Sequence, residues 1–272
     1  MKKVNIGVAG AAGKMGRAII QAIYNNPNAL LTAALESENC QYLNRDAGEL
    51  IGIKTDVQII NDLKKFCDSC EVIIDFSAVE ATLKLVEFIA KKSKNSNKIV
   101  IGTTGFSVDQ KNNIQKLAQK TAIVLSPNMS IGVNILFKIA AIVSNIIGNE
   151  YDIEIVEAHH NKKKDSPSGT AMRLAEVIAE QINYDISKTA VYGRQGLIGA
   201  RKKQEIGILA LRAGDIVGEH TVTFAGPGER IELTHRAHSR DTFANGAVNA
   251  AVWLNAKTKG LFSMADVLNI KL

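Results

Sequence analysis

Apolar and polar positions in the first half of the chain follow two alternating periods. Short runs of consecutive apolar residues, typical of buried strands, are separated by stretches in which apolar residues recur every three or four positions, which is typical of amphipathic helices. The expected strands are Val4–Ala9, Leu30–Leu35, Val57–Ile60, Val72–Phe76, Ile99–Ile101 and Ala122–Leu125, and the expected helices are Lys14–Tyr24, Val79–Lys92 and Asp109–Ala118. This alternation predicts βαβ units and a parallel sheet.

The pattern changes after Pro127. Long helical periods are interrupted by runs that alternate residue by residue, which is typical of antiparallel strands. The expected elements are helix Ile131–Ile147, strand Ile153–Ala158, helix Gly169–Ile182, strands Ile206–Leu211, Val217–Phe224 and Ile231–His235, and helix Phe243–Asn255. A Gly-Pro-Gly-Glu turn at residues 226–229 is expected to join the last two strands.

This change of pattern predicts an α/β protein of two domains. Residues 1–128, with 241–272 returning to them, are expected to form a Rossmann-like doubly wound parallel sheet that binds a dinucleotide. Residues 129–240 are expected to form a smaller α+β domain with a mixed sheet.

Composition narrows the class of protein. Of the 272 residues, 46% are hydrophobic and 22% are charged, which is typical of globular proteins and excludes disordered and fibrous classes. The net charge of +6 is modest, with one basic run at residues 162–164, so we expect no nucleic-acid partner. The most apolar stretch, Ile131–Ile147, contains Asn134 and Lys138, which favours a buried helix over a membrane span. With no signal peptide at the start, a cytoplasmic protein is expected.

The chain has three cysteines, Cys40, Cys67 and Cys70, and this odd number argues against a disulfide framework. Cys67 and Cys70 form a C-x-x-C motif, but a zinc site would need a second pair of ligands. We interpret them as incidental thiols and expect no metal.

The first expected strand leads directly into a glycine-rich segment that opens a helix. Its residues are Gly10, Ala11, Ala12, Gly13, Lys14, Met15 and Gly16. Glycines let the backbone turn tightly against a pyrophosphate, and the helix N-terminus supplies N–H groups and a positive dipole. Glu36 follows the second strand, where a carboxylate accepts hydrogen bonds from ribose hydroxyls. A glycine turn with a solvated acid is the alternative interpretation.

Two more turns follow expected strands, at the sheet edge where α/β proteins bind ligands. Gly102, Thr103 and Thr104 offer small side chains and hydroxyls to a nicotinamide ribose. The second turn, Ser126, Pro127, Asn128 and Met129, offers main-chain groups and an amide. Each is equally well interpreted as a tight turn alone.

The segment from Glu157 to Thr170 carries most of the chemistry. His159 and His160 end a strand, three lysines follow, and Ser168, Gly169 and Thr170 open a helix. Imidazoles and ammonium groups beside a helix N-terminus suit proton transfer to an anionic small molecule. The alternatives are a zinc site completed by Glu157 or His235, a solvated lysine loop, and a lysine Schiff base.

These residues resemble the signature of the 4-hydroxy-tetrahydrodipicolinate reductase family, also called dihydrodipicolinate reductases, of the diaminopimelate route to lysine. The motif E-A-H-H-x-x-K-x-D-x-P-S-G-T matches residues 157–170, and GAAGKMGR, IGTTGF and SRDTFANGAV extend the match along the chain. The resemblance implies reduction of a cyclic dicarboxylate with NADH or NADPH and loss of water, in a homotetramer built through the second domain's sheet.

The resemblance also implies roles for individual residues. His159 would be the acid/base group and Lys163 its protonating partner, while Arg240 would lie near the boundary of cofactor and substrate. The substrate carboxylates would be held by His160, Lys163, Ser168, Gly169 and Thr170. The nucleotide would lie on Gly10, Ala11, Ala12, Gly13, Lys14, Met15, Glu36, Gly102, Thr103, Thr104 and Ser126 to Met129.

Cofactor choice is where the chain departs from the family pattern. Ser37 follows Glu36, whereas members that hold a 2′-phosphate often carry a basic residue there, so NADH is expected to be preferred. Another nicotinamide dehydrogenase and a non-catalytic dinucleotide sensor are the competing functions. All three cysteines precede the catalytic half, which argues against a phosphorylating semialdehyde dehydrogenase.

Overall fold

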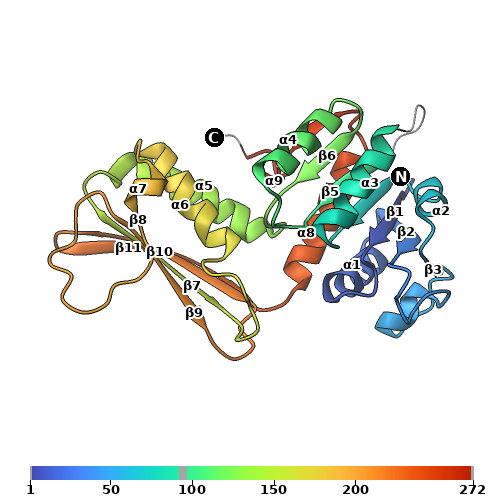
Figure 1. The fold of residues 1–272 in the computed structure, drawn as a ribbon, viewed down its shortest axis with the longest axis horizontal. Coiled ribbons are helices and arrows are strands. Elements are labelled where there is room, and N and C mark those ends of the chain that lie inside the picture. The colour runs from blue at the N-terminus through green and yellow to red at the C-terminus, as the bar shows by residue number, and fades with distance from the viewer. Residues whose placement is uncertain (1, 92–96, 271–272) are drawn as a thin grey trace. The chain divides into compact units, whose positions relative to one another are not determined.

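The computed structural model describes residues 2–91 and 97–270, which form two compact units (Figure 1). Unit 1 comprises the described residues up to 131 together with 240–270. Unit 2 comprises residues 132–239. The chain therefore leaves the first unit once and returns to it.

Unit 1 is built on a parallel sheet. Its seven strands, counted among the described residues, run in the order β12-β6-β5-β4-β1-β2-β3. The strands are β1 (Val4–Ala9), β2 (Ala29–Leu35), β3 (Ile59–Ile60), β4 (Val72–Asp75), β5 (Lys98–Ile101), β6 (Ala122–Leu125) and β12 (Gly260–Phe262). The helical segments are α1 (Lys14–Asn25), η1 (Ala47–Ile51), α2 (Leu63–Asp68), α3 (Val79–Lys91), α4 (Val108–Leu117), α8 (Asp241–Leu254) and α9 (Met264–Val267).

Helices cover both faces of this sheet, so its strands are apolar at successive positions rather than alternate ones. In β4, Val72 and Ile74 join the core with residues of α1 and α8, whereas Ile73 joins the opposite core with residues of α3 and α4. All four residues of β4 are buried, including Asp75 at its carboxyl end. The sheet thus carries a buried carboxylate at the edge where its strands end.

Unit 2 is built on a mixed sheet. Among the described residues its strand order is β11-β10-β7-β9-β8. The strands are β7 (Asp152–His159), β8 (Ala190–Val191), β9 (Ile206–Arg212), β10 (Gly218–Gly226) and β11 (Glu229–Ala237), and the helices are α5 (Ile131–Ile147), α6 (Gly169–Gln181) and α7 (Ile186–Thr189). Ile153, Ile155, Val222 and Phe224 pack with residues of α5 and α6 on one face.

The α/β class with a parallel sheet and a second, mixed sheet is confirmed, but one strand direction is wrong. Ile206–Leu211 was expected to be antiparallel to its neighbours, whereas β9 pairs with β7 in the parallel direction. The physical reason is the connection: helices α6 and α7 lie between these strands, and a helical crossover returns the chain in the same direction. The antiparallel pairs are β10 with β7 and β10 with β11.

Most element boundaries agree with the sequence pattern within two residues. Helix α5 and strands β1 and β6 have the expected limits, while β3 begins at Ile59 rather than Val57. Lys92, expected to end a helix, lies outside the described residues. Six elements, each of at most six residues, were not expected from the sequence: η1, α2, α7, β8, β12 and α9. Short elements show too few periods to be recognised.

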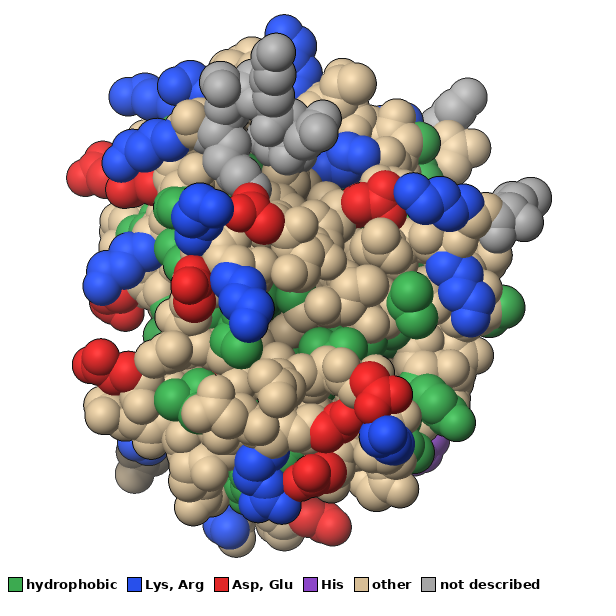
Figure 2. All heavy atoms as spheres, turned by 90° about the vertical axis from the view of Figure 1, so that its right-hand side faces the viewer, with side chains coloured by type: hydrophobic (Ala, Val, Ile, Leu, Met, Phe, Trp, Pro, Cys, Tyr) green, Lys and Arg blue, Asp and Glu red, His purple; other side chains and the backbone are tan. Residues whose placement is uncertain are grey.

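The charge distribution can be followed on one face of the molecule. Figure 2 shows that Lys and Arg side chains are intermixed there with Asp and Glu, and that no single basic patch dominates the described residues of this face. None of the helices in the described part of the chain combines the length and apolarity that a membrane crossing requires.

Candidate functional site

The glycine-rich turn between β1 and α1 is shaped for close approach of a ligand. Gly10 has a φ of +74°, which favours glycine. A Cβ on Gly16 would lie 2.1 Å from the Gly10 carbonyl oxygen, so only glycine fits where the helix meets the turn. Helix α1 begins after Gly13 with no side-chain cap and no acidic residue in its first turn. Its first N–H groups therefore remain available to an anion, and the turn fits a pyrophosphate.

Glu36 lies beside this turn, as its place after β2 predicts. Its Oε1 accepts a hydrogen bond from the Ala12 N–H at 2.8 Å, and its Oε2 accepts one from the Ser37 N–H at 3.1 Å. Each carboxylate oxygen keeps a further lone pair for a ligand hydroxyl. Gly10, Gly13 and Glu36 line one cavity of about 740 Å³ in unit 1.

Other residues lining this cavity were not found from the sequence. Phe76 and Ser77 follow β4, and Lys84 lies on α3. Glu38 adds a second carboxylate to the lining. Phe76 and Ser77 could have been found from their place at the carboxyl end of a strand. Lys84 could not, because its position depends on how α3 packs.

The remaining residues proposed for the nucleotide differ in exposure and in whether they line this cavity. Lys14 is exposed, while Met15 packs against the apolar core and offers a ligand mainly its backbone. The turns at 102–104 and 126–129 follow β5 and β6, the next strands along the same sheet edge, and neither is part of the cavity lining. Within them Thr103, Ser126 and Met129 are buried.

In unit 2, strand register brings a second set of polar residues onto one face of the sheet. Glu157 and His159, two residues apart on β7, share the face of the buried Ile153 and Ile155, since side chains alternate along a strand. His220 on β10 pairs with Glu157, and Arg212 on β9 pairs with His159.

Glu157 is at the centre of the contacts made by this set. It is fully buried and accepts two hydrogen bonds from the Arg212 guanidinium, at 2.7 and 2.8 Å. Its Oε2 lies 2.6 Å from His159 Nδ1, and its Oε1 accepts the Ser168 N–H at 2.9 Å. We call Glu157, His159, Ser168, Arg212 and His220 the Glu157 cluster; His220 joins it through Ser168 Oγ, 3.1 Å from His220 Nε2.

The cluster fixes the ionisation states of its members. Burial acts to raise the pKa of Glu157, but hydrogen bonds from Arg212, His159 and the Ser168 N–H outweigh it, and the net pKa is lowered. Burial lowers the pKa of His159, with Glu157 opposing and Lys163 and Arg212 adding to the effect. Burial and the charge of His159 lower the pKa of His220 to about 3, so His220 is neutral near pH 7.

The arrangement gives the two nitrogens of His159 different roles. Because an ionised carboxylate only accepts, Nδ1 carries the proton shared with Glu157, and Nε2 is the nitrogen not engaged by Glu157. Gly218 lies across from it, where a Cβ would be 3.1 Å from Nε2. A glycine there keeps the space beside Nε2 open.

Lys163 lies in the loop after β7. Its Nζ makes two hydrogen bonds of 2.9 Å to the Asp165 carboxylate, and its side chain is 20% exposed. The Lys163 N–H also bonds the His160 carbonyl, which tightens the loop. The Arg212 guanidinium bonds the Asp165 carbonyl at 2.8 Å, so the loop is tied to the Glu157 cluster.

The N-terminus of α6 adjoins the same cluster. Ser168 is the N-cap: its hydroxyl accepts the Ala171 N–H and its N–H is bonded to Glu157. Ser168 therefore makes its polar contacts within the protein, which suits a positioning role. In the first turn of α6, Gly169 is exposed and Thr170 is buried.

The other histidines do not gather into a metal site. No group of three or more His, Cys, Asp or Glu side chains suited to a metal ion occurs among the residues that the structure describes. His160 Nδ1 is buried without a hydrogen-bond partner in the structure. His235 pairs with His220 across β10 and β11, on the far side from His159.

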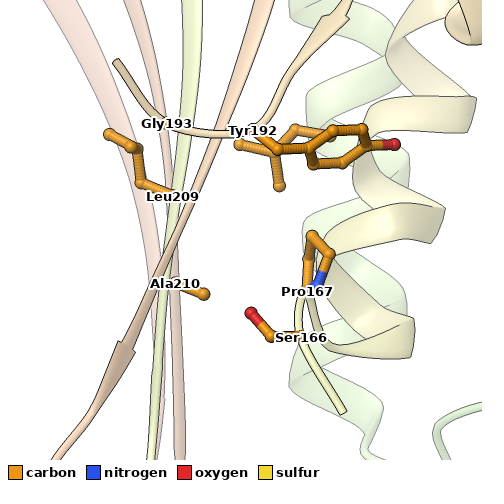
Figure 3. Close-up of a pocket in the computed structure, with 7 residues that line it drawn as sticks. Ser166, Pro167, Tyr192, Gly193, Leu209 and Ala210 are labelled. Atoms are coloured by element: carbon orange, nitrogen blue, oxygen red, sulfur yellow. The ribbon is translucent and has the colours of Figure 1, made fainter. Parts of the chain in front are cut away.

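A second cavity, of about 510 Å³, lies in unit 2 near the loop that carries Ser166 and Pro167 (Figure 3). Figure 3 shows Pro167 and Tyr192 on one side, with Leu209 and Ala210 on the other. Its lining residues carry no charged side chain, so an anion would find no counter-charge among them.

The sequence did not identify four members of the unit 2 site. Glu157 was considered only as a metal ligand, although its spacing of two from His159 places both on one strand face. Arg212 and His220 are 55 and 52 residues from their partners, Glu157 and Ser168, and only the sheet register brings them together. Asp165 was visible only as part of the motif.

Comparisons with known proteins agree along the whole chain. Models of the dihydrodipicolinate reductase family match residues 4–129, as the N-terminus, and residues 132–268, as the C-terminus. A 4-hydroxy-tetrahydrodipicolinate reductase of Hahella chejuensis is 49% identical over 98% of this chain and 99% of its own length. One from Neisseria meningitidis serogroup B is 47% identical over 99% of both.

Solved structures with low sequence identity share the fold. A dipicolinate-bound dihydrodipicolinate reductase from Paenisporosarcina sp. TG-14 superposes with a TM-score of 0.73, at 24% identity over 99% of this chain and all of its own. An amine dehydrogenase from Mycobacterium smegmatis gives a TM-score of 0.59 at 12% identity, over 96% of this chain and 95% of its own.

Proposed function

The chain belongs to the dihydrodipicolinate reductase family, and on that premise we propose that it reduces 4-hydroxy-tetrahydrodipicolinate to tetrahydrodipicolinate. The reaction consumes one NADH or NADPH and one proton and releases water. The observation that carries the proposal is the contact between the buried Glu157 and the partly buried His159 beside the N-terminus of α6. This pair supports proton transfer and anion binding in one unit, and the glycine turn of the other unit suits the hydride donor.

The nicotinamide cofactor, when bound, supplies the hydride. The turn from Gly10 to Gly13 would let its pyrophosphate approach closely, the N–H groups of Lys14 and Met15 at the start of α1 would bind it, and Glu36 would hold its adenosine ribose. Gly102 to Thr104 and Ser126 to Met129 would hold the nicotinamide half. The support for this assignment is the uncapped helix and the steric need for Gly16, which leave room for a phosphate and no room for a side chain.

His159 and Lys163 would manage protons and charge at the substrate. His159 Nε2 takes or gives the proton, while Glu157 holds the ring through Nδ1. The Lys163 ammonium donates a proton and stabilises charge as the hydride arrives. The contact of Lys163 with Asp165 holds the ammonium within the loop that follows the two histidines.

The two carboxylates of the substrate would be bound by His160, Lys163 and the start of α6. The N–H groups of Gly169 and Thr170 and the positive end of the helix dipole favour an anion. Ser168 would contribute by holding the cap in place. The family resemblance further supports a cytoplasmic homotetramer assembled through the unit 2 sheet.

The function is tested with a coupled assay. Purified protein is mixed with aspartate semialdehyde, pyruvate and the upstream synthase, and NADH absorbance is followed. We expect NADH oxidation that depends on the synthase. Oxidation that proceeds equally without synthase, or none with it, would overturn the proposed substrate. Direct titration of NADH fluorescence tests cofactor binding separately from turnover.

A further inference from the structure

A second buried carboxylate lies in unit 1, and the reaction as described does not use it. Asp75 ends β4 with no solvent exposure. Its Oδ1 accepts the Ser77 N–H at 3.0 Å and the Ser77 hydroxyl at 2.5 Å, and its Oδ2 accepts the Thr82 hydroxyl at 2.5 Å. Leaving a buried carboxylate in an apolar sheet is costly, so these donors need a reason beyond packing.

The contacts of Asp75 reach three parts of the nucleotide region. Ser77 lines the 740 Å³ cavity. Thr82 lies in the first turns of α3, and its hydroxyl is 3.1 Å from that of Thr103. Thr103 belongs to the turn after β5, and the Gly102 N–H bonds the Asp75 carbonyl. We call Asp75, Ser77, Thr82 and Thr103 the Asp75 cluster.

The Thr82 hydroxyl links the other members of this cluster. Thr82 Oγ1 lies 2.5 Å from Asp75 Oδ2, and it lies 3.1 Å from both the Ala78 carbonyl oxygen and Thr103 Oγ1. In the contact with Thr103, Thr82 is the donor and Thr103 the acceptor. The Thr103 hydroxyl therefore keeps its own proton and a lone pair, both of which suit a ribose hydroxyl.

We propose that Asp75 is a positioning residue for the cofactor, acting through Thr82 to orient the Thr103 hydroxyl for a hydrogen bond with the nicotinamide ribose. The proposal rests on the function proposed above, because it takes the turn at 102–104 as part of the nucleotide site. It extends that function by assigning a role to two residues that do not line the cavity.

The test compares cofactor affinity in variants that break the chain of hydroxyls at different points. NADH is titrated by its fluorescence into full-length wild type, Thr82→Val, Thr82→Ser and Asp75→Asn. We expect Kd for NADH to rise about tenfold in Thr82→Val and Asp75→Asn, because an oriented hydrogen bond is lost. Thr82→Ser keeps the hydroxyl and should stay near wild type. The kcat of all three should change less than about twofold, since the proton-transfer residues are untouched.

Thr121→Val is the matched control. Thr121 is a buried threonine of unit 1 whose hydroxyl donates to the Asn97 carbonyl at 2.7 Å, next to the start of β6 rather than its carboxyl end. It should lower the melting temperature as Thr82→Val does, without changing Kd for NADH. A matching rise of Kd in Thr121→Val would show that general loss of stability explains the result.

A double-mutant cycle tests whether Thr82 affects NADH binding through Thr103. If Thr82 acts through Thr103, then Thr82→Val in a Thr103→Val background should add less than about twofold to Kd. Additive effects, or wild-type Kd in Thr82→Val, would overturn the proposal. Should Thr82→Val fail to fold, Asp75→Asn and its cycle with Thr103→Val give the same decision. A wild type that binds neither NADH nor NADPH would refute the proposed function itself.

Discussion

Each unit of the protein holds a fully buried carboxylate near the end of a strand, and the two are stabilised in different ways. Glu157 accepts from the Arg212 guanidinium, an imidazole and a backbone N–H. Asp75 accepts only from neutral groups, the Ser77 N–H and the hydroxyls of Ser77 and Thr82. A cation therefore accompanies one carboxylate and hydroxyls accompany the other.

The pKa values of the two groups move in opposite directions. Burial raises the pKa of Asp75, and its hydrogen bonds with Ser77 and Thr82 only partly oppose this. The pKa of Glu157 is lowered, because its charged partners outweigh burial. Charge at the strand end suits a site that holds a reactive imidazole. Neutral donors suit a site whose task is to orient other hydroxyls.

The largest expected effect comes from removing the charge of Glu157. Glu157→Gln keeps the size of the side chain but removes the counter-charge to which the Arg212 guanidinium is hydrogen-bonded, so the free energy of unfolding should fall by about 3–5 kcal/mol. The loss should be greatest near neutral pH. A lowered pKa contributes stability above the unfolded pKa, and this contribution disappears as pH falls through the folded value. Urea denaturation followed by circular dichroism measures it.

Glu180→Gln is the control for this prediction. Glu180 pairs with Arg173 on α6, and its side chain is 57% exposed, so the substitution should cost less than about 1 kcal/mol. If Glu157→Gln lowered the free energy of unfolding no more than Glu180→Gln does, the claim that Glu157 is stabilised by its ion pair would be wrong.

The next largest effect concerns the reactive groups that the charged site holds. His159→Gln and Lys163→Ala should each lower kcat by about a hundredfold or more, because proton transfer and charge stabilisation are lost. Kd for NADH should not change, since both residues lie in unit 2. Lys164→Ala, an exposed neighbour, is the matched control and should keep wild-type kcat. Near-wild-type kcat in the first two variants contradicts their assignment.

Anion binding at the start of α6 gives a smaller effect. Thr170→Val preserves shape and removes a hydroxyl from the carboxylate site, so KM for the substrate should rise about tenfold. Thr170→Ser should restore most of it. Pyridine-2,6-dicarboxylate is expected to compete with substrate in steady-state kinetics. Competition with NADH instead would place the anion site elsewhere.

The hydroxyl-bound carboxylate makes the opposite pH prediction to Glu157. A raised pKa means that Asp75 contributes stability fully present below the unfolded pKa of about 3.8 and lost as pH rises through the folded value. The stability difference between wild type and Asp75→Asn should therefore favour wild type more in acid than near neutral pH. The single tryptophan, Trp253 in α8 of unit 1, reports unfolding by its fluorescence. If the stability difference between wild type and Asp75→Asn grew toward neutral pH, Asp75 would behave as Glu157 does, and the contrast between the two carboxylates would be wrong.

The smallest effect concerns cofactor choice in the unit 1 cavity. Glu36 and Glu38 line it and would repel a 2′-phosphate by about 1–3 kcal/mol, with Lys84 as a lining cation that offsets part of this. Arg17 is held by the Ala12 carbonyl and stacks on Tyr42. We expect kcat/KM to favour NADH by a modest factor, and Ser37→Arg to narrow or reverse the preference. Lys84→Met should weaken NADPH use further.

A wild type that prefers NADPH would contradict this account of the cavity. NADH kinetics serve as the internal control, because Ser37→Arg and Lys84→Met should change kcat/KM for NADH by less than about twofold. Loss of NADH use in Ser37→Arg would mean that the substitution distorts the turn after β2.

The sequence predicts what local chemistry determines and misses what register determines. β1, α1 and β2 follow from apolar periods and glycines, and so does the cavity formed by Gly10, Gly13 and Glu36. The direction of β9 depends on the crossover of 46 residues between His159 and Ile206, and no period of its own residues encodes it. The Glu157 cluster depends on the register of three strands, because pairing of β7 with β9 and β10 brings their polar residues together. Asp75 lies inside the expected strand Val72–Phe76, and its contact with Thr82 becomes visible only when β4 and α3 are packed.

The discontinuity of unit 1 has a consequence for the order in which the protein is made. Strand β12 pairs with β6, so that Gly260 lies against Ala122, and α8 packs on α1. A chain growing from its N-terminus presents all of unit 2 before the segment from 240 onward emerges. The smaller unit can therefore fold on the ribosome while the nucleotide-binding sheet still lacks an edge strand and a covering helix. Because these contacts span more than a hundred residues, closing unit 1 should be the slow step of biogenesis.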